Sequence, residues 1–330
     1  MSDADTRPQA DQAEGDLRPD QAVGQDSSAA VAAATGGADV GGVGREASLW
    51  SDAWRQLRRN PLFILAALII VTFTVMAAFP HLFTSFYPGD PDPRSCSLSN
   101  STVRPSATAW FGYDLQGCDY YANVIYGAKV SMIVGIATAI FAGAIAIIFG
   151  SLAGYYGGRL DTLISRITDI FFGIPTILGA IVILNSIGER GLTQVTIVLV
   201  ALGWMTMLRL MRSSTIERRD ADFVDAARAL GASTPRVIMR HILPNAIAPV
   251  IVYGTIFIGV AISVEASLSF LGAGLQLPAI SWGLMINSSF RRVLQAPHLL
   301  LFPGTFLTVL VLAFIVLGDA LRDALDPRLR

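Results

Sequence analysis

The residues of this chain that can do acid–base, redox or metal chemistry are few and scattered. The 330 residues include two cysteines and three histidines, and the single lysine is Lys129. The sequence contains no nucleophile–base pair and no group with the spacing of metal ligands. A phosphate-binding loop needs a lysine after a glycine-rich turn, whereas Lys129 follows Ala128. The sequence therefore predicts no catalytic residue, no metal site and no cofactor bound by this chain.

A polar segment with seven arginines, residues 209–245, separates two long apolar stretches and is typical of a docking element. Within it, an apolar stripe follows the spacing i, i+3, i+4 and i+7, which is one face of a helix. The stripe consists of Phe223, Ala226, Ala227 and Leu230. The two alanines keep it thin, so that a partner surface can approach closely. The stripe therefore predicts a surface that binds another protein.

The residues after this stripe predict a turn and a second helix. Gly231 stands where a helix would end in a left-handed residue, a conformation that costs less for glycine than for a residue with a Cβ. Ser233 or Thr234 can cap the next helix, and Pro235 suits its first turn. That helix is expected to run to the proline before the next apolar stretch. The segment thus predicts a helix–glycine–helix hairpin.

The elements that must hold this hairpin are apolar helices. The chain is 53% hydrophobic and only 15% charged, unlike an ordinary soluble domain. Six uncharged windows follow one another, each close to the roughly 20 apolar residues that cross a bilayer as a helix. One such window can be a buried core helix, but six in series predict an all-α, polytopic membrane protein with six transmembrane helices. The windows are Leu62–Phe79, Ser131–Tyr156, Ile170–Gly188, Leu192–Leu208, Ala246–Val264 and Leu299–Gly318.

The placement of arginines orients these helices, because positively charged flanks stay on the cytoplasmic side of a membrane. With the N-terminus inside, the inner flanks carry more than twice as many basic residues as the outer flanks. The 209–245 segment contributes the largest share of this bias. Both termini and the hairpin are therefore expected in the cytoplasm.

Both cysteines, Cys96 and Cys118, then fall in the outer loop between the first two spans. The outer compartment permits disulfides. A bridge would close a loop of about twenty residues and stabilise the fold by roughly 3 kcal/mol in the chain-entropy model. Two free thiols in a mobile loop are the alternative. The presence of the only two cysteines in one loop favours the bridge.

The chain divides into four parts. Residues 1–44 have almost no large apolar side chains and are expected to form a disordered cytoplasmic tail. Residues 45–60 carry an apolar stripe that predicts an interfacial amphipathic helix on the inner membrane surface, with a helix packed on protein as the alternative. Residues 61–128 hold the first transmembrane helix and an extracytoplasmic loop. Residues 129–330 form a core domain with five transmembrane helices and the hairpin, at about 217–245.

At the hairpin, the sequence resembles the EAA loop of ABC-importer permeases. Asp225-Ala226-Ala227 matches the start of that motif, Gly231 follows, and Leu243-Pro244 matches its end. The resemblance implies the type I ABC importer permease fold, in which this hairpin is the coupling element that inserts into a groove of an ATP-hydrolysing subunit. The ATPase-coupling residues would be Phe223, Asp225, Ala226, Ala227, Leu230, Gly231, Leu243 and Pro244.

Other motifs are similar to those of the C-type subunit of the peptide-permease (peptide/nickel) subfamily. They are Gly112-Tyr113-Asp114, Tyr126-Gly127-Ala128-Lys129, Leu268-Ser269-Phe270-Leu271-Gly272 and the stretch from Gly318 to Arg328. The sequence departs from the family pattern in that Asp225 replaces the usual glutamate and Cys118 the usual arginine. Neither change touches the permease resemblance, and the second points again to a pairing of Cys118 with Cys96.

The resemblance implies a set of partners and a location. A second homologous permease subunit would complete the pathway, two ABC ATPase subunits would bind ATP and Mg, and an extracytoplasmic substrate-binding protein would deliver di- or oligopeptides. The chain would be a non-enzymatic subunit in the bacterial plasma membrane, surrounded by lipid and without a nucleic-acid partner. Nickel, haem or another small substrate is the alternative cargo. An ion-coupled secondary transporter is a remote alternative, because the mid-span positions are nearly free of charge.

Two positions within the spans are candidates for the pathway. Glu265 lies toward the outer end of the fifth span, and intramembrane charges commonly mark a translocation route. Pro175 is expected to kink the third span. Arg166 and Asp169 are close enough along the same span to pair across one helical turn.

Overall fold

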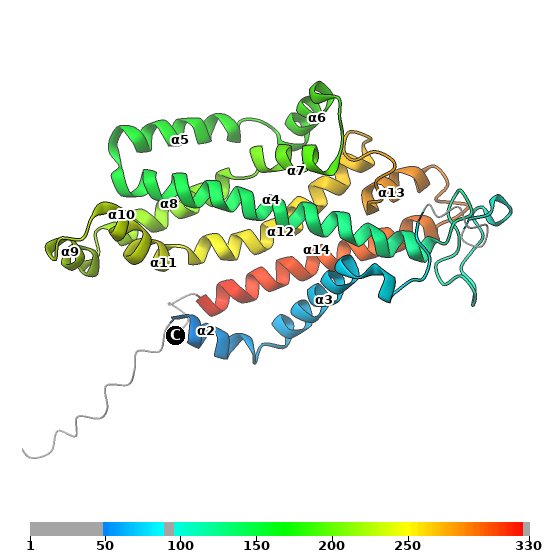
Figure 1. The fold of residues 1–330 in the computed structure, drawn as a ribbon, viewed down its shortest axis with the longest axis horizontal. Helices are drawn as coiled ribbons and strands as arrows, with labels where there is room; N and C mark the ends of the chain where they lie inside the picture. Colours follow the sequence, from blue (N-terminus) through cyan, green and yellow to red (C-terminus); the bar gives the residue numbers. More distant parts are fainter. Residues whose placement is uncertain (1–48, 89–95, 326–330) are drawn as a thin grey trace, which may run out of the picture. The chain divides into compact units, whose positions relative to one another are not determined.

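The computed structural model describes residues 49–88 and 96–325, and these residues contain helices but no β-strand. The tail expected at residues 1–44 lies outside the described residues. Most of the described residues belong to helices (Figure 1). These are α2 (Leu49–Leu57), α3 (Pro61–Ala78), α4 (Tyr120–Tyr156), α5 (Gly158–Phe172), α6 (Thr176–Ile187), α7 (Leu192–Ala201), α8 (Met205–Arg219), α9 (Asp222–Ala229), α10 (Thr234–Arg236), a π-helix (Val237–Ile242), α11 (Leu243–Ala246), α12 (Ala248–Phe270), α13 (Trp282–Phe290) and α14 (His298–Leu325), with short 3-10 turns at Pro80–Leu82 and Leu98–Asn100.

Four of these helices are long and apolar enough to cross a membrane unbroken, namely α3, α4, α12 and α14. The two remaining spans are bent pairs: α5 and α6 meet at 86°, and α7 and α8 meet at 44°. Counting each pair once gives the six spans that the apolar windows predict.

The third span differs from its predicted course. The apolar window begins at Ile170, whereas α5 begins at Gly158 and the chain turns sharply just before α6. Pro175 caps α6, where its missing N–H and fixed φ suit a helix start but not a helix interior. The window missed α5 because that helix carries Asp161, Arg166 and Asp169 among its apolar residues.

The second span is also longer than its window. The apolar window begins at Ser131, but α4 already begins at Tyr120, after Asp119 accepts a hydrogen bond from the Ala122 N–H at 3.1 Å. Lys129 interrupts the apolar run without interrupting the helix. The helix is therefore about three turns longer than its window. A further short helix, α13, was predicted by no window.

Small residues let α4 lie close to α8. Ala146, Gly150 and Gly154 recur every four residues on α4, and each is buried. An ideal Cβ added at Gly154 would lie 2.7 Å from Thr215 Cβ and 2.8 Å from the Arg212 carbonyl oxygen. Helices in membranes associate through such small-residue faces, which allow close backbone approach. The contact fixes α8, from which the hairpin continues.

One face of the α2 helix packs on protein, and its predicted position on the membrane surface stays a prediction. Ala53 and Leu57 are buried against Ala320 and Ala324 of α14, whereas Trp54 is exposed. Figure 1 shows α2 beside the C-terminal end of α14. One face of α2 is therefore covered by its own chain.

At the opposite end of the long helices from α9, residues 96–119 form a compact loop (Figure 1). Cys96 and Cys118 are joined there in a disulfide. The Ser97 N–H donates to the Gly117 carbonyl at 3.0 Å, and the Asp114 carboxylate accepts from the Cys118 N–H at 2.8 Å. Burial raises the pKa of Asp114, although the hydrogen bond from the Cys118 N–H opposes the shift.

Candidate functional site

The predicted hairpin projects from the ends of α8 and α12 (Figure 1). Its first arm is α9 and its second arm comprises α10, the π-helix and α11. Gly231 joins the arms with φ of +80°, in the left-handed region that a residue with a Cβ rarely adopts. The N–H of Ala232 returns to the Ala227 carbonyl at 3.0 Å and closes the end of α9.

The first arm has two apolar faces rather than one. Val224 and Ala227 face inward and are buried, and Val224 belongs to a core cluster with Val237 of the second arm and residues of α4, α8 and α12. Phe223 and Leu230 face outward with exposed fractions of 40% and 90%. The predicted stripe was therefore wrong in placing Ala227 on the outward face, which comprises Phe223, Ala226 and Leu230. Sequence reasoning missed Val224, although its i, i+3 spacing to Ala227 was a signal for the inner face.

The second arm contains a widened helical turn before Pro244. The π-helix runs from Val237 to Ile242, and Pro244 lies in the first turn of α11. Proline has no N–H for the carbonyl four residues earlier, and its ring would collide with that carbonyl in a regular helix. A π turn gives this carbonyl more room. Pro244 is exposed and Leu243 is half-buried. The helix was predicted to end at Leu243, just before this proline, but it continues through α11 toward α12.

The charges of the first arm lie beside its outward face. Asp225 is exposed and pairs with Arg228 at 2.9 Å, and the Arg228 guanidinium lies 5.5 Å from the centre of the Tyr155 ring. The contact with Tyr155, followed by that with Asp225, raises the pKa of Arg228. Arg228 therefore stays charged between the hairpin and the end of α4.

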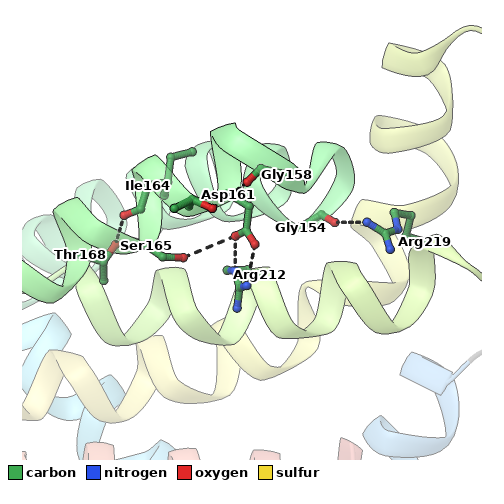
Figure 2. A network of polar contacts seen from close by, with 9 residues as sticks. Gly154, Gly158, Asp161, Ile164, Ser165, Thr168, Arg212 and Arg219 are labelled. Carbon is green, nitrogen blue, oxygen red and sulfur yellow. Dashed lines mark hydrogen bonds and ion pairs between the residues drawn. The ribbon is translucent and has the colours of Figure 1, made fainter.

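Two ion pairs connect α5 to α8, the helix that leads into the hairpin. Figure 2 shows the Asp161 carboxylate between the Ser165 hydroxyl and the Arg212 guanidinium, which donates from Nε and, at 2.7 Å, from Nη2. Three residues earlier on α8, Arg209 pairs with Asp169 at 2.7 Å. The predicted pairing of Asp169 with Arg166 was therefore wrong, because α5 lies along α8 and brings Asp169 to Arg209 instead.

Glu265 lies inside the chain and not on an open wall. Its side chain is fully buried, and Oε1 accepts a hydrogen bond from the Ser269 hydroxyl at 2.8 Å. The Ser269 oxygen in turn accepts from the Leu275 N–H at 3.1 Å, which ties the segment after α12 to that helix. Glu265 Oε2 has no hydrogen-bond partner among residues 49–88 and 96–325. In this structure, Glu265 thus reaches no surface from which it could line a pathway.

Pro175 has a different environment from Glu265. It is exposed at the 86° break between α5 and α6, so the predicted kink is present as a sharp turn. Residues on both sides of it, Ile174 and Thr176, line a cavity that α4, α7, α8 and α12 also border.

The membrane-spanning helices and the hairpin between α8 and α12 together point to one class of protein. Residues 146–330 match the family described as the inner membrane component of binding-protein-dependent transport systems, and residues 48–99 match the N-terminal transmembrane domain of oligopeptide transport permease C. The chain belongs to this family of multi-pass membrane permeases. Permeases of this family serve ABC importers, which also comprise ATPases and substrate-binding proteins.

Individual relatives cover most of the chain. The dipeptide transport system permease protein DppC of Alkalihalophilus pseudofirmus is 41% identical over 86% of this chain and 91% of its own length. The oligopeptide transport system permease protein OppC of Bacillus subtilis is 36% identical over the same two shares. The glutathione transport system permease protein GsiD of Escherichia coli is 37% identical over 85% of this chain and 91% of its own length.

Solved structures support the fold. The chain is similar to a chain of the MetNI methionine ABC transporter in inward-facing conformations, with a TM-score of 0.51 and 20% identity. The likeness covers 61% of this chain and 96% of that chain. The fold is therefore the type I importer permease fold expected from the EAA-like hairpin.

Proposed function

We propose that this chain imports di- and oligopeptides as one of two homologous permease subunits that together enclose a translocation pathway. Relatives named for dipeptide, oligopeptide and glutathione transport support a peptide cargo over nickel or haem. Two ABC ATPase subunits would bind and hydrolyse ATP with Mg, and a binding protein outside the cell would deliver the peptide. This chain would supply the path and the coupling but no catalytic group.

The proposed location is the bacterial plasma membrane, with both termini and the hairpin in the cytoplasm. The excess of arginines on that side supports this orientation. The disulfide between Cys96 and Cys118 agrees with it, because the loop that holds both cysteines would then face the compartment in which disulfides persist.

The observation that carries the proposal is the outward face of α9, where Leu230 is 90% exposed beside Phe223 and Ala226. An apolar side chain held in this way by a rigid turn suits a pocket on another protein. The inner face of the same helix is anchored by Val224 in the core of the chain, and Ala227 on this face is buried as well. Force applied to the outer face would therefore reach α8 directly and α12 through the second arm.

The proposed coupling follows from this continuity. When the ATPases close on ATP, they would displace the hairpin, and α8 would move with it. The ion pairs of Arg212 with Asp161 and of Arg209 with Asp169 would carry that movement to α5 and so to the bend beside Pro175. The broken span would thereby alternate between two arrangements.

The test compares two substitutions on one helix. Ala226 and Ala229 are both exposed alanines of α9, but Ala226 stands four residues before Leu230 and so lies next to it along the helix, whereas the adjacent Ala229 does not face Leu230. Ala226→Arg should abolish peptide uptake and peptide-dependent ATP hydrolysis in reconstituted vesicles, while the subunit remains inserted. Ala229→Arg should retain most of both activities. Wild-type uptake by Ala226→Arg would overturn the proposed docking surface.

A further inference from the structure

We propose that the cavity between the two broken spans is a subsite for the terminal carboxylate of a peptide in transit, an inference that rests on the proposed import of peptides. The cavity has a volume of about 210 Å³. It lies where both breaks occur, since Ile174 and Thr176 line it from the first and Gly203 and Thr206 from the second. Thr138, the central residue of the long helix α4, lines it as well.

Two helix starts border this cavity with unused backbone donors. The first backbone hydrogen bond into α6 is from the Gly179 N–H to the Pro175 carbonyl at 2.8 Å, and the first into α8 is from Leu208 to Trp204 at 3.0 Å. Neither helix has a side-chain cap. The three N–H groups before each of these bonds therefore have no backbone or capping acceptor within the described chain.

These donors favour a negatively charged acceptor. The N-terminus of a helix carries about half a positive elementary charge, and its open N–H groups bind carboxylate or phosphate oxygens directly. Both α6, with 12 residues, and α8, with 15, are long enough to develop this dipole. Away from water, an N–H group without an acceptor is costly, so a ligand that supplies oxygen atoms would be stabilised there.

Thr138 gives an independent sign of a ligand. Its side chain is fully buried, and its hydroxyl has no hydrogen-bond partner in the part of the chain that the structure describes. Among the other buried threonines in these spans, Thr168 donates to the Ile164 carbonyl at 2.8 Å and Thr196 donates to Leu192 at 2.8 Å. The Thr215 hydroxyl, which packs at Gly154 of α4, also has no partner in the described chain, but Thr215 does not border the cavity. Of these unpartnered threonines, Thr138 is the one that borders the cavity, so its hydroxyl is the one that an acceptor bound there would engage.

The rest of the lining fits a subsite that must release what it binds. None of the described residues that border the cavity is charged, and Phe172, Leu199 and Phe257 make its walls apolar. Helix dipoles and hydroxyl groups in such surroundings attract a carboxylate but bind it less tightly than the charge-assisted hydrogen bonds of an arginine would. Every unmodified peptide has a C-terminal carboxylate whatever its side chains, so this subsite would accept a varied cargo.

The test measures binding of dialanine to the purified permease–ATPase complex without binding protein, by saturation-transfer NMR. Wild type should bind dialanine, and dialaninamide, which lacks the carboxylate, should not displace it. Thr138→Val should weaken binding about tenfold, as expected for the loss of one hydrogen bond to a charged group. Thr138→Ser should restore it, and Thr168→Val should bind like wild type, because the Thr168 hydroxyl is already used by its own helix.

The outcomes separate the subsite from the importer. Displacement of dialanine by dialaninamide, or equal weakening by Thr138→Val and Thr168→Val, would overturn the subsite. If the complex with Thr138→Val does not assemble, Thr206→Val provides the same comparison from the break between α7 and α8. Uptake of dialanine by vesicles that contain the whole system, without saturable binding to the complex, would remove the subsite and leave the proposed function intact. The absence of both uptake and binding would remove the proposed function itself.

Discussion

The ion pair between Asp161 and Arg212 should hold α5 on α8 more firmly than its neighbour does. Asp161 and Arg212 make two hydrogen bonds, and their side chains are only 20% and 34% exposed. At about 3 Å and an effective dielectric constant of about 20, their attraction is roughly 5 kcal/mol before desolvation. Desolvation and lost side-chain freedom offset part of this, so we expect a coupling free energy of about 2 kcal/mol.

The pair of Asp169 with Arg209 is a matched control on the same two helices. It makes one contact at 2.7 Å, and both side chains are 52% exposed. Exposed pairs contribute about 0.2–1 kcal/mol. The two pairs have the same chemistry, so a difference between their couplings would report burial and geometry.

The assay is a double-mutant cycle on each pair. The free energy of unfolding of the purified chain in mild detergent is measured by denaturant titration for Asp161→Asn, Arg212→Gln and the double variant, and likewise for the control pair. The coupling is the difference between the double variant and the sum of the single ones. Equal couplings at both pairs would refute the argument from burial.

Two further changes test the packing and the outer loop. Gly154→Leu should destabilise the fold by about 1–3 kcal/mol, because the added side chain meets α8. Gly304→Leu is the control: a Cβ added there meets no described atom within 4 Å, so the free energy of unfolding should stay nearly unchanged. Similar losses in both variants would contradict the close packing. Cys96→Ser should lower the free energy of unfolding by about 3 kcal/mol, since the disulfide spans 22 residues. A reductant should destabilise the wild type but not this variant, and an equal response of both would count against the bridge.

Local patterns in the sequence were enough to predict the spans and the hairpin. Six apolar windows match the four unbroken helices and the two bent pairs, because membrane-crossing helices satisfy their backbone hydrogen bonds internally and each is recognised by its own composition. Gly231 and Pro235 marked the turn and the second arm because left-handed and first-turn positions restrict a residue's own φ. The motifs around the hairpin likewise carried the family resemblance without any tertiary information.

The tertiary structure decided which side chains meet. Asp161 and Arg212 lie 51 residues apart, and they pair because α5 lies along α8 in the folded chain. Val224 turns inward because α4 and α8 offer a core there, and Glu265 is enclosed because Ser269 and its neighbours surround it. The cavity at Thr138 likewise needs both helix breaks at one depth. Periodicity fixes the faces that a helix has, but only its neighbours determine which face is buried.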